Sequence, residues 1–182
     1  MDEEQEEIVE EQENVTVKQV SMKWGLYLGM VLIIYGMILL VADLVGNQTL
    51  GYVNYVFVAV FMYMAHKSFK DEGNGYMSYG QGLGIGTLMA AVGAGISTVF
   101  SFLYVTLVDD SMMETIREIT EQSMIDRGMP DAQIEQAMAM SDKMMTPAIM
   151  FPMAFIFMVI FSFIIALIVS AITKNPDPTA DI

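Results

Sequence analysis

The chain has 182 residues, of which 54% are hydrophobic and only 16% are charged. A typical soluble domain has about 25% charged residues, so this composition argues against the soluble class. The 22 acidic and 8 basic side chains give a formal net charge of −14. This charge disfavours nucleic acid as a partner, because nucleic-acid binding depends on neutralising phosphates. The absence of cysteine excludes disulfides, thiol catalysis and thiolate metal sites.

The sequence opens on "MDEEQEEIVEEQEN", in which eight of the residues are acidic. Like charges repel and the segment has little apolar mass, so residues 1–16 are expected to form a disordered acidic tail. Further along, residues 73–108 and residues 144–173 contain no charged side chain. A helix needs about 20 apolar residues to cross a bilayer, so these runs predict an integral membrane protein.

A membrane domain is predicted over residues 17–174, with four spans at about 24–45, 50–69, 82–108 and 148–173. Trp24 and Tyr27 are expected at the level of the lipid head groups, where amphipathic rings are common. The second span has a short uncharged core, so His66 and Lys67 are expected at the membrane interface. Residues 175–182 form a short C-terminal tail.

The polar segment 109–147 is predicted to form a helical hairpin outside the membrane. Ser111 followed by Glu114 has the spacing of a capping box, and Gly128 suits the end of a helix over about 111–127. Pro130 suits the first position of a second helix that ends near residue 145. The predicted fold class is therefore all-α: an integral membrane four-helix bundle with an extramembrane helical hairpin between the third and fourth spans.

The basic residues predict the orientation in the membrane. With four spans, both termini and the loop after the second span share one side, which holds Lys18, Lys23, Lys67, Lys70 and Lys174. The other side holds Arg117, Arg127 and Lys143. Lysine and arginine are enriched in short cytoplasmic flanks, so both termini are expected in the cytoplasm and the hairpin outside.

The third span, which begins in "YGQGLGIGTLMAAVGAGISTVFS", is rich in small residues. A dinucleotide-binding motif would require glycine at Ile85 or Thr87, and no strand precedes the segment. Small residues four positions apart let membrane helices approach closely. The residues predicted to pack in this way are Gly82, Gly86, Ala90, Gly93, Ala94, Ser97 and Ser101. The alternative is that this face lines a conduit or a lipid groove.

A candidate polar cluster lies at the hairpin side of the first three spans and comprises Asp43, Asn54 and Tyr104. Asp43 is the only acid in an uninterrupted apolar run, and an intramembrane carboxylate favours a functional role. It lies two residues before that run ends, so contact with interfacial water is the preferred interpretation. His66 is the only histidine, so it cannot form a histidine metal site, and no nucleophile partner is apparent.

The stretch "AMAMSDKMM" raises the question of a Cu(I) site, because soft thioether ligands select this ion. The candidate ligands are Met138, Met140, Met144 and Met145. On a helix, Met138 and Met140 point about 200° apart at roughly 100° per residue, which makes them a poor chelating pair. Methionine is more often an adaptable hydrophobic residue, so no metal site is favoured and no cofactor is expected.

Several of these motifs occur in a fixed order: "YGQGLGIG", "YVTLVDD", "RGMPDAQIEQAMAM" and "KMMTP" before the last span. This combination resembles a family of small bacterial four-span proteins of unknown function, seen chiefly in Bacteroidetes. The resemblance covers about Val17 to Lys174 and leaves out the acidic tail. Pro130 departs from it, because relatives more often have a capping serine or a similar residue there. The resemblance implies a multi-pass four-helix protein of the bacterial inner (cytoplasmic) membrane, and it implies no activity, ligand or catalytic residue.

The expected function is non-enzymatic, that of a membrane protein with a structural or interaction-mediating role through helix packing. Its expected partners are the lipid bilayer and either a second copy, giving a homo-oligomer, or another membrane protein. The alternative is a small transporter or channel component, with the third span and Asp43 lining the route. An enzyme is the least expected class, because no nucleophile, base and orienting group occur together.

Overall fold

The computed structural model describes residues 15–178. Six helices follow one another in the order α2 (Val17–Val41), α3 (Gln48–Glu72), α4 (Tyr79–Leu107), α5 (Ser111–Asp126), α6 (Asp131–Met144) and α7 (Pro147–Thr173). The predicted all-α fold class is confirmed. Most of the expected acidic tail, residues 1–14, lies outside the described residues, as do residues 179–182.

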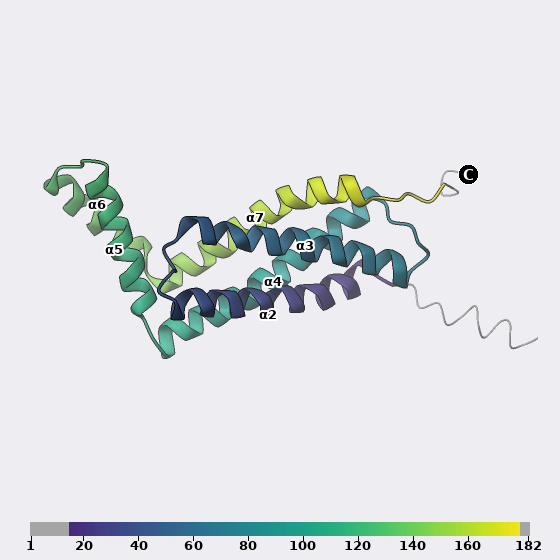
Figure 1. The fold of residues 1–182 in the computed structure, drawn as a ribbon, viewed down its shortest axis with the longest axis horizontal. Helices are drawn as coiled ribbons and strands as arrows, with labels where there is room; N and C mark the ends of the chain where they lie inside the picture. The colour runs from purple at the N-terminus through teal and green to yellow at the C-terminus, as the bar shows by residue number, and fades with distance from the viewer. Residues whose placement is uncertain (1–14, 179–182) are drawn as a thin grey trace, which may run out of the picture.

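Four of the helices, α2, α3, α4 and α7, are 25 to 29 residues long and apolar enough to cross a membrane. At 1.5 Å per residue each is about 38 to 44 Å long, more than the roughly 30 Å hydrocarbon core of a bilayer. They form an elongated bundle from which α5 and α6 project at one end, the hairpin end (Figure 1). The first and last described residues lie at the opposite end, the termini end (Figure 1).

The central helix of the bundle is α4, which packs most extensively against α2 and α7. Glycine makes the approach of α2 close: a Cβ on Gly25 would lie 2.7 Å from the Cβ of Val92 and 2.9 Å from the carbonyl oxygen of Met89. On the α7 side, a Cβ on Gly86 would lie 3.1 Å from the Cβ of Ala166. Both approaches depend on residues without large side chains, as expected for helix pairs in lipid.

The partners of α4 carry small residues at the same four-residue spacing. In α2 the buried small residues are Ser21, Gly25 and Gly29, and in α7 they are Ser162, Ala166 and Ser170. Only the small residues of the third span were predicted from the sequence to take part in packing. Complementary small residues on three helices explain how their backbones come together along α4.

The buried core lies mainly in the half of the bundle nearer the termini end. Leu28, Met62, Ile85 and Met89 are fully buried there. Over the second half of α2, by contrast, Ile34 and Ile38 are 60% and 57% exposed. The bundle is therefore tightly packed at one end, and its outer surface is apolar enough to face lipid.

The helix α2 ends earlier than the predicted first span, because the chain turns in a Schellman motif. Asp43 has a φ angle of 57°, in the left-handed region. The amide of Leu44 donates to the carbonyl of Leu39 at 2.8 Å, and the amide of Asp43 donates to the carbonyl of Leu40 at 3.1 Å. These two bonds define the motif. Asp43 therefore lies beyond the helix and is exposed, although the sequence analysis places it inside the first span.

The helix starts in the hairpin differ by one residue from the prediction. Asp110 is the N-cap of α5 and makes no side-chain capping bond, so the expected capping box at Ser111 is not formed. Instead, the carboxylate of Asp109 accepts the amide hydrogen of Ser111. Pro130 is the N-cap of α6 rather than its first residue. Gly128 has a φ angle of 72° just after α5, as suits the predicted stop of that helix.

Two alanine substitutions on the same helix test the role of close packing. Gly25→Ala places a methyl group against Val92 and Met89, so we expect it to lower the free energy of unfolding by about 1 to 3 kcal/mol. Gly36→Ala meets nothing within 4 Å and should be neutral or stabilise by up to about 1 kcal/mol through helix propensity. Equal effects of the two variants on thermal unfolding in detergent would contradict this account.

The conformation of Asp43 gives a second prediction. Asparagine tolerates the left-handed region and should replace Asp43 without loss of stability. Valine is strained there, so Asp43→Val should lower the free energy of unfolding by about 1 to 2 kcal/mol. Denaturant unfolding of both purified variants checks this. If Asp43→Asn is as destabilising as Asp43→Val, the role of Asp43 lies in its charge and not in its backbone.

Candidate functional site

The helices α5 and α6 form a hairpin that contacts the bundle at its base. Arg117 of α5 and Asp142 of α6 form an ion pair with a distance of 2.9 Å between Nε and Oδ1. Ile134 and Met138 of α6 are buried between the helices. At the base, a Cβ on Gly46, in the loop between α2 and α3, would overlap Ile119 of α5, so the hairpin rests on that loop.

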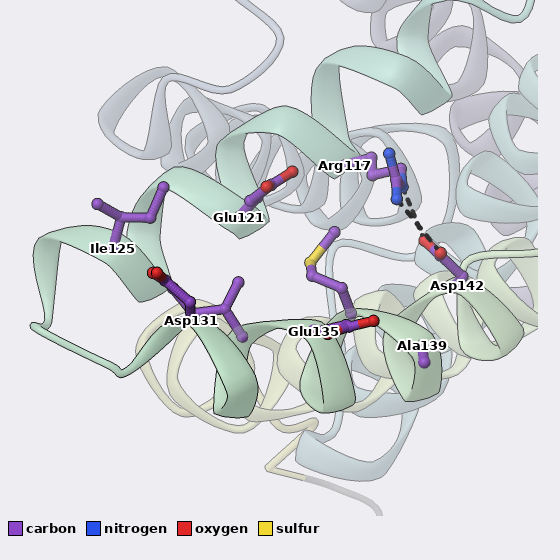
Figure 2. Close-up of a pocket in the computed structure, with 9 residues that line it drawn as sticks. Arg117, Glu121, Ile125, Asp131, Glu135, Ala139 and Asp142 are labelled. Atoms are coloured by element: carbon purple, nitrogen blue, oxygen red, sulfur yellow. Dashed lines mark hydrogen bonds and ion pairs between the residues drawn. The ribbon is translucent and has the colours of Figure 1, made fainter.

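A groove of about 490 Å³ runs between the two hairpin helices (Figure 2). Its apolar lining consists of Ile125, Ile134, Met138 and Ala139. The charged residues of its lining are Arg117, Glu121, Asp131, Glu135 and Asp142. The two helices supply opposite walls, and the pair of Arg117 with Asp142 closes one end in the view of Figure 2. The groove thus combines an apolar floor with a charged rim.

The rim of the groove is strongly acidic. Four carboxylates lie beside one guanidinium, which leaves a net charge of −3 when all are ionised. The only cation on the rim is already paired, and the hydrogen bond from Arg117 to Asp142 raises the pKa of that guanidinium. Within residues 15–178, Glu121, Asp131 and Glu135 take part in no ion pair. Their charge is therefore available to a cationic ligand.

The four methionines considered as copper ligands do not share one surface. Met138 is buried in the hairpin and lines the groove. Met140 and Met144 are 69% and 49% exposed, and Met145 follows the last residue of α6 as its C-cap. One thioether thus faces α5 while two others face solvent.

A second cavity, of about 220 Å³, lies at the hairpin end of the bundle between α2, α3 and α4. Asn54 and Tyr104 from the candidate polar cluster both line it, together with Ser101. Asp43 is not among its lining residues and lies exposed beyond α2. The structure therefore brings together two members of the predicted cluster and leaves out the third. Gly36 and Gly51 help to form the cavity, because a Cβ on either would meet nothing within 4 Å.

The predicted packing residues of the third span all lie on α4. Five of them are buried: Gly82, Gly86, Ala90, Gly93 and Ala94. Ser97 and Ser101 are half-buried. What covers them belongs to the same chain: Ser170 lies beside Gly82, Met62 and Ala166 beside Gly86, and Leu28 beside Gly93.

A group of polar contacts at the termini end, here called the polar junction, was missed by the sequence analysis. It comprises His66, Lys70, Gly82 and Thr173. The ring of His66 is fully buried by its neighbouring helices, and its expected place at the level of the membrane interface stays a prediction. Its Nδ1 lies 2.7 Å from Thr173 Oγ1 and its Nε2 lies 2.8 Å from the carbonyl oxygen of Gly82. Lys70 Nζ donates to the carbonyl oxygen of Thr173 at 3.1 Å.

The sequence contains a signal for this burial. The buried apolar residues of α3 include Val58, Met62, Ala65 and Phe69, and His66 lies on the same helical face, four residues after Met62. Lys67 is exposed, as expected for a lysine at the interface. The two neighbouring residues therefore differ in exposure, because they lie about 100° apart around the helix.

The family described as "Protein of unknown function (DUF4199)" matches residues 23–175. That segment contains α3 to α7 completely, most of α2, the groove and the polar junction, and it leaves out the acidic residues at the start of the chain. Comparisons with curated proteins and with solved structures find no match. Because the match extends over most of the sequence, the chain belongs to this family of unknown function.

Proposed function

We propose that the protein is a non-enzymatic membrane anchor that presents the α5–α6 hairpin as an interaction surface. The observation that carries this proposal is the groove, which combines an apolar floor with an acidic rim on a segment outside the bundle. The small residues of α4 support it indirectly. They are covered by α2, α3 and α7 of the same chain, so their packing builds one protomer and leaves the hairpin as the surface for a partner.

The chemistry of the groove indicates the class of partner. Complementary charges guide association and fix the register of an interface. A net charge of −3 around an apolar floor suits a basic segment that carries an apolar side chain between lysines or arginines. Ile125 and Met138 would contact that side chain, while Glu121 and Glu135 would contact the flanking cations. A neutral or acidic partner would leave these carboxylates unpaired.

The distribution of basic residues supports an orientation for this surface. Five lysines lie near the termini end: Lys18, Lys23, Lys67, Lys70 and Lys174. The longer segment from α5 to α6 has only three basic residues. We place both termini in the cytoplasm and the hairpin on the outer face of a bacterial inner membrane, following the enrichment of cations in cytoplasmic flanks. The partner then approaches from outside the cytoplasm.

A peptide-binding experiment tests the groove. The probe is a synthetic peptide with a central phenylalanine flanked by lysines, and the protein is the full chain in nanodiscs of zwitterionic lipid. Reversing two rim charges, in the double variant Glu121→Lys and Glu135→Lys, should weaken binding measured by fluorescence anisotropy by at least about tenfold, because like charges then face one another. Binding to the unmodified chain should also weaken with salt.

The matched control reverses two exposed carboxylates of α5 that do not line the groove, in the double variant Glu114→Lys and Glu118→Lys. It makes the same change in net charge on the same hairpin, so it should reduce binding far less. Equal loss in both double variants would show that only overall charge matters. A peptide with glutamates in place of the lysines that binds equally well would overturn the proposed partner chemistry.

The cavity near Asn54 favours a second candidate function, that of a small transporter or channel component. It lies against the hairpin-side half of α4, and its lining includes the amide of Asn54 and the hydroxyl groups of Ser101 and Tyr104. Polar groups inside a membrane helix commonly mark a ligand or ion route. Asp43 is exposed beyond α2 and does not line the cavity, so it would lie at the entrance of such a route and not along it.

Filling the cavity separates the two candidates. Gly36→Leu adds a side chain where a Cβ meets open space, so the fold should persist. In proteoliposomes with pH-sensitive and potential-sensitive dyes, the anchor function predicts no ion flux through the unmodified chain, and unchanged peptide binding in Gly36→Leu and Asp43→Asn. Flux through the unmodified chain that either substitution blocks would favour the transporter.

A further inference from the structure

The polar junction contains the only histidine of the chain, and its ring contacts two other helices. His66 projects from α3, while its two ring nitrogens contact the first turn of α4 and the last residue of α7. The ring is fully buried, and Thr173 is 7% exposed. An ionisable side chain buried among membrane helices suggests a function, because its charged form is costly unless hydrogen bonds support it.

The contacts around the ring can all be hydrogen bonds at once only when the ring carries one hydrogen atom more than its neutral form. The carbonyl of Gly82 can only accept, so Nε2 carries a hydrogen. The hydroxyl of Thr173 has one hydrogen but two acceptors in reach, the carbonyl of Val169 at 2.8 Å and His66 Nδ1 at 2.7 Å. All three contacts are hydrogen bonds at the same time only when Nδ1 also carries a hydrogen. The complete network is therefore that of the imidazolium.

The neutral form also fits, with one bond fewer. When Nδ1 has no hydrogen, the hydroxyl of Thr173 can turn from the carbonyl of Val169 and donate to Nδ1. The carbonyl of Val169 still accepts the α-helical hydrogen bond from the backbone amide four residues later, that of Thr173. A proton can thus enter or leave through the rotation of one hydroxyl group, without movement of a helix.

The charges near the ring determine how firmly the proton is held. Neither α4 nor α7 contains a charged residue, and the nearest titratable group on α4 is Tyr79, which donates to the carbonyl of Leu167. Lys70 of α3 contacts Thr173, and its positive charge opposes a second cation at His66. Within residues 15–178, the other charged groups on or beside these helices at this end are Lys18, Lys23, Lys67, Asp71, Glu72, Lys174 and Asp177. Within this set Glu72 is paired with Lys23 at 2.9 Å.

We propose that His66 is a reversible proton-binding site, and that its protonation strengthens the attachment of α3 to α4 and α7. The proton binds at Nδ1 and is shared with Thr173 Oγ1. Burial and Lys70 favour release, whereas the three hydrogen bonds favour binding, so the site changes state instead of remaining permanently charged. This inference is independent of the hairpin groove, which lies at the other end of the bundle.

Nuclear magnetic resonance of the ring nitrogens tests the site directly. The full chain, labelled with ¹⁵N-histidine and carrying no histidine tag, gives signals from His66 alone. In lipid nanodiscs we expect one reversible transition, from a ring with hydrogen on Nε2 only to a ring with hydrogen on both nitrogens as the pH falls. A ring that stays neutral at every pH at which the protein remains folded would overturn the proposal.

Substitutions on α7 show whether the transition runs through Thr173. Thr173→Val removes the hydroxyl that accepts from the charged ring, so the transition should move to lower pH by about one unit, because bonds to charged groups are the stronger ones. Thr173→Ser should keep the original midpoint. The matched control, Ser162→Ala, removes a buried hydroxyl that has no hydrogen-bond partner and should leave the midpoint unchanged. Equal shifts in Thr173→Val and Ser162→Ala would overturn the assigned proton path.

Discussion

The fold depends on how closely the backbone of α4 approaches its neighbours. In lipid, helices gain little from burying apolar surface, so association depends on contact between complementary shapes. Gly25 and Gly86 supply that contact on two sides of α4, against Met89 and Val92 of α4 in one case and Ala166 of α7 in the other. The helix α3 runs along the bundle beside them (Figure 1) and packs with larger side chains, such as those of Met62 and His66.

Polar contacts between the long helices are distributed unevenly along the bundle. At the termini end, His66 and Lys70 join α3 to its neighbours, and the backbone of Asn175 pairs with that of Met77 at 2.8 Å in both directions. Near the hairpin end, the hydroxyl of Tyr35 donates to the carbonyl of Leu50. The cavity lies at this less connected end. One end thus fixes the arrangement of the helices, and the other leaves space between them.

Much of the fold follows from the sequence because uncharged runs of helical length have few other solutions. The runs that became α4 and α7, the hairpin between them and the stop at Gly128 were all predictable in this way. Features that depend on which helices become neighbours could not be predicted from the sequence. Asp43 lies in an apolar run that does not show the turn after α2, and His66 acquires its role only when Thr173, 107 residues later, lies beside it.

The way the hairpin joins the bundle also determines where a force on it would act. Its two helices continue α4 and α7 through links of only three and two residues, 108–110 and 145–146. A pull on the hairpin is therefore a load on α4 and α7, while α2 and α3 lie outside the main load path. At the far end, these two loaded helices are the ones that the ring of His66 joins through Gly82 and Thr173. Tension applied outside the bundle would reach this small polar contact about 40 Å away, along helices that rise 1.5 Å per residue.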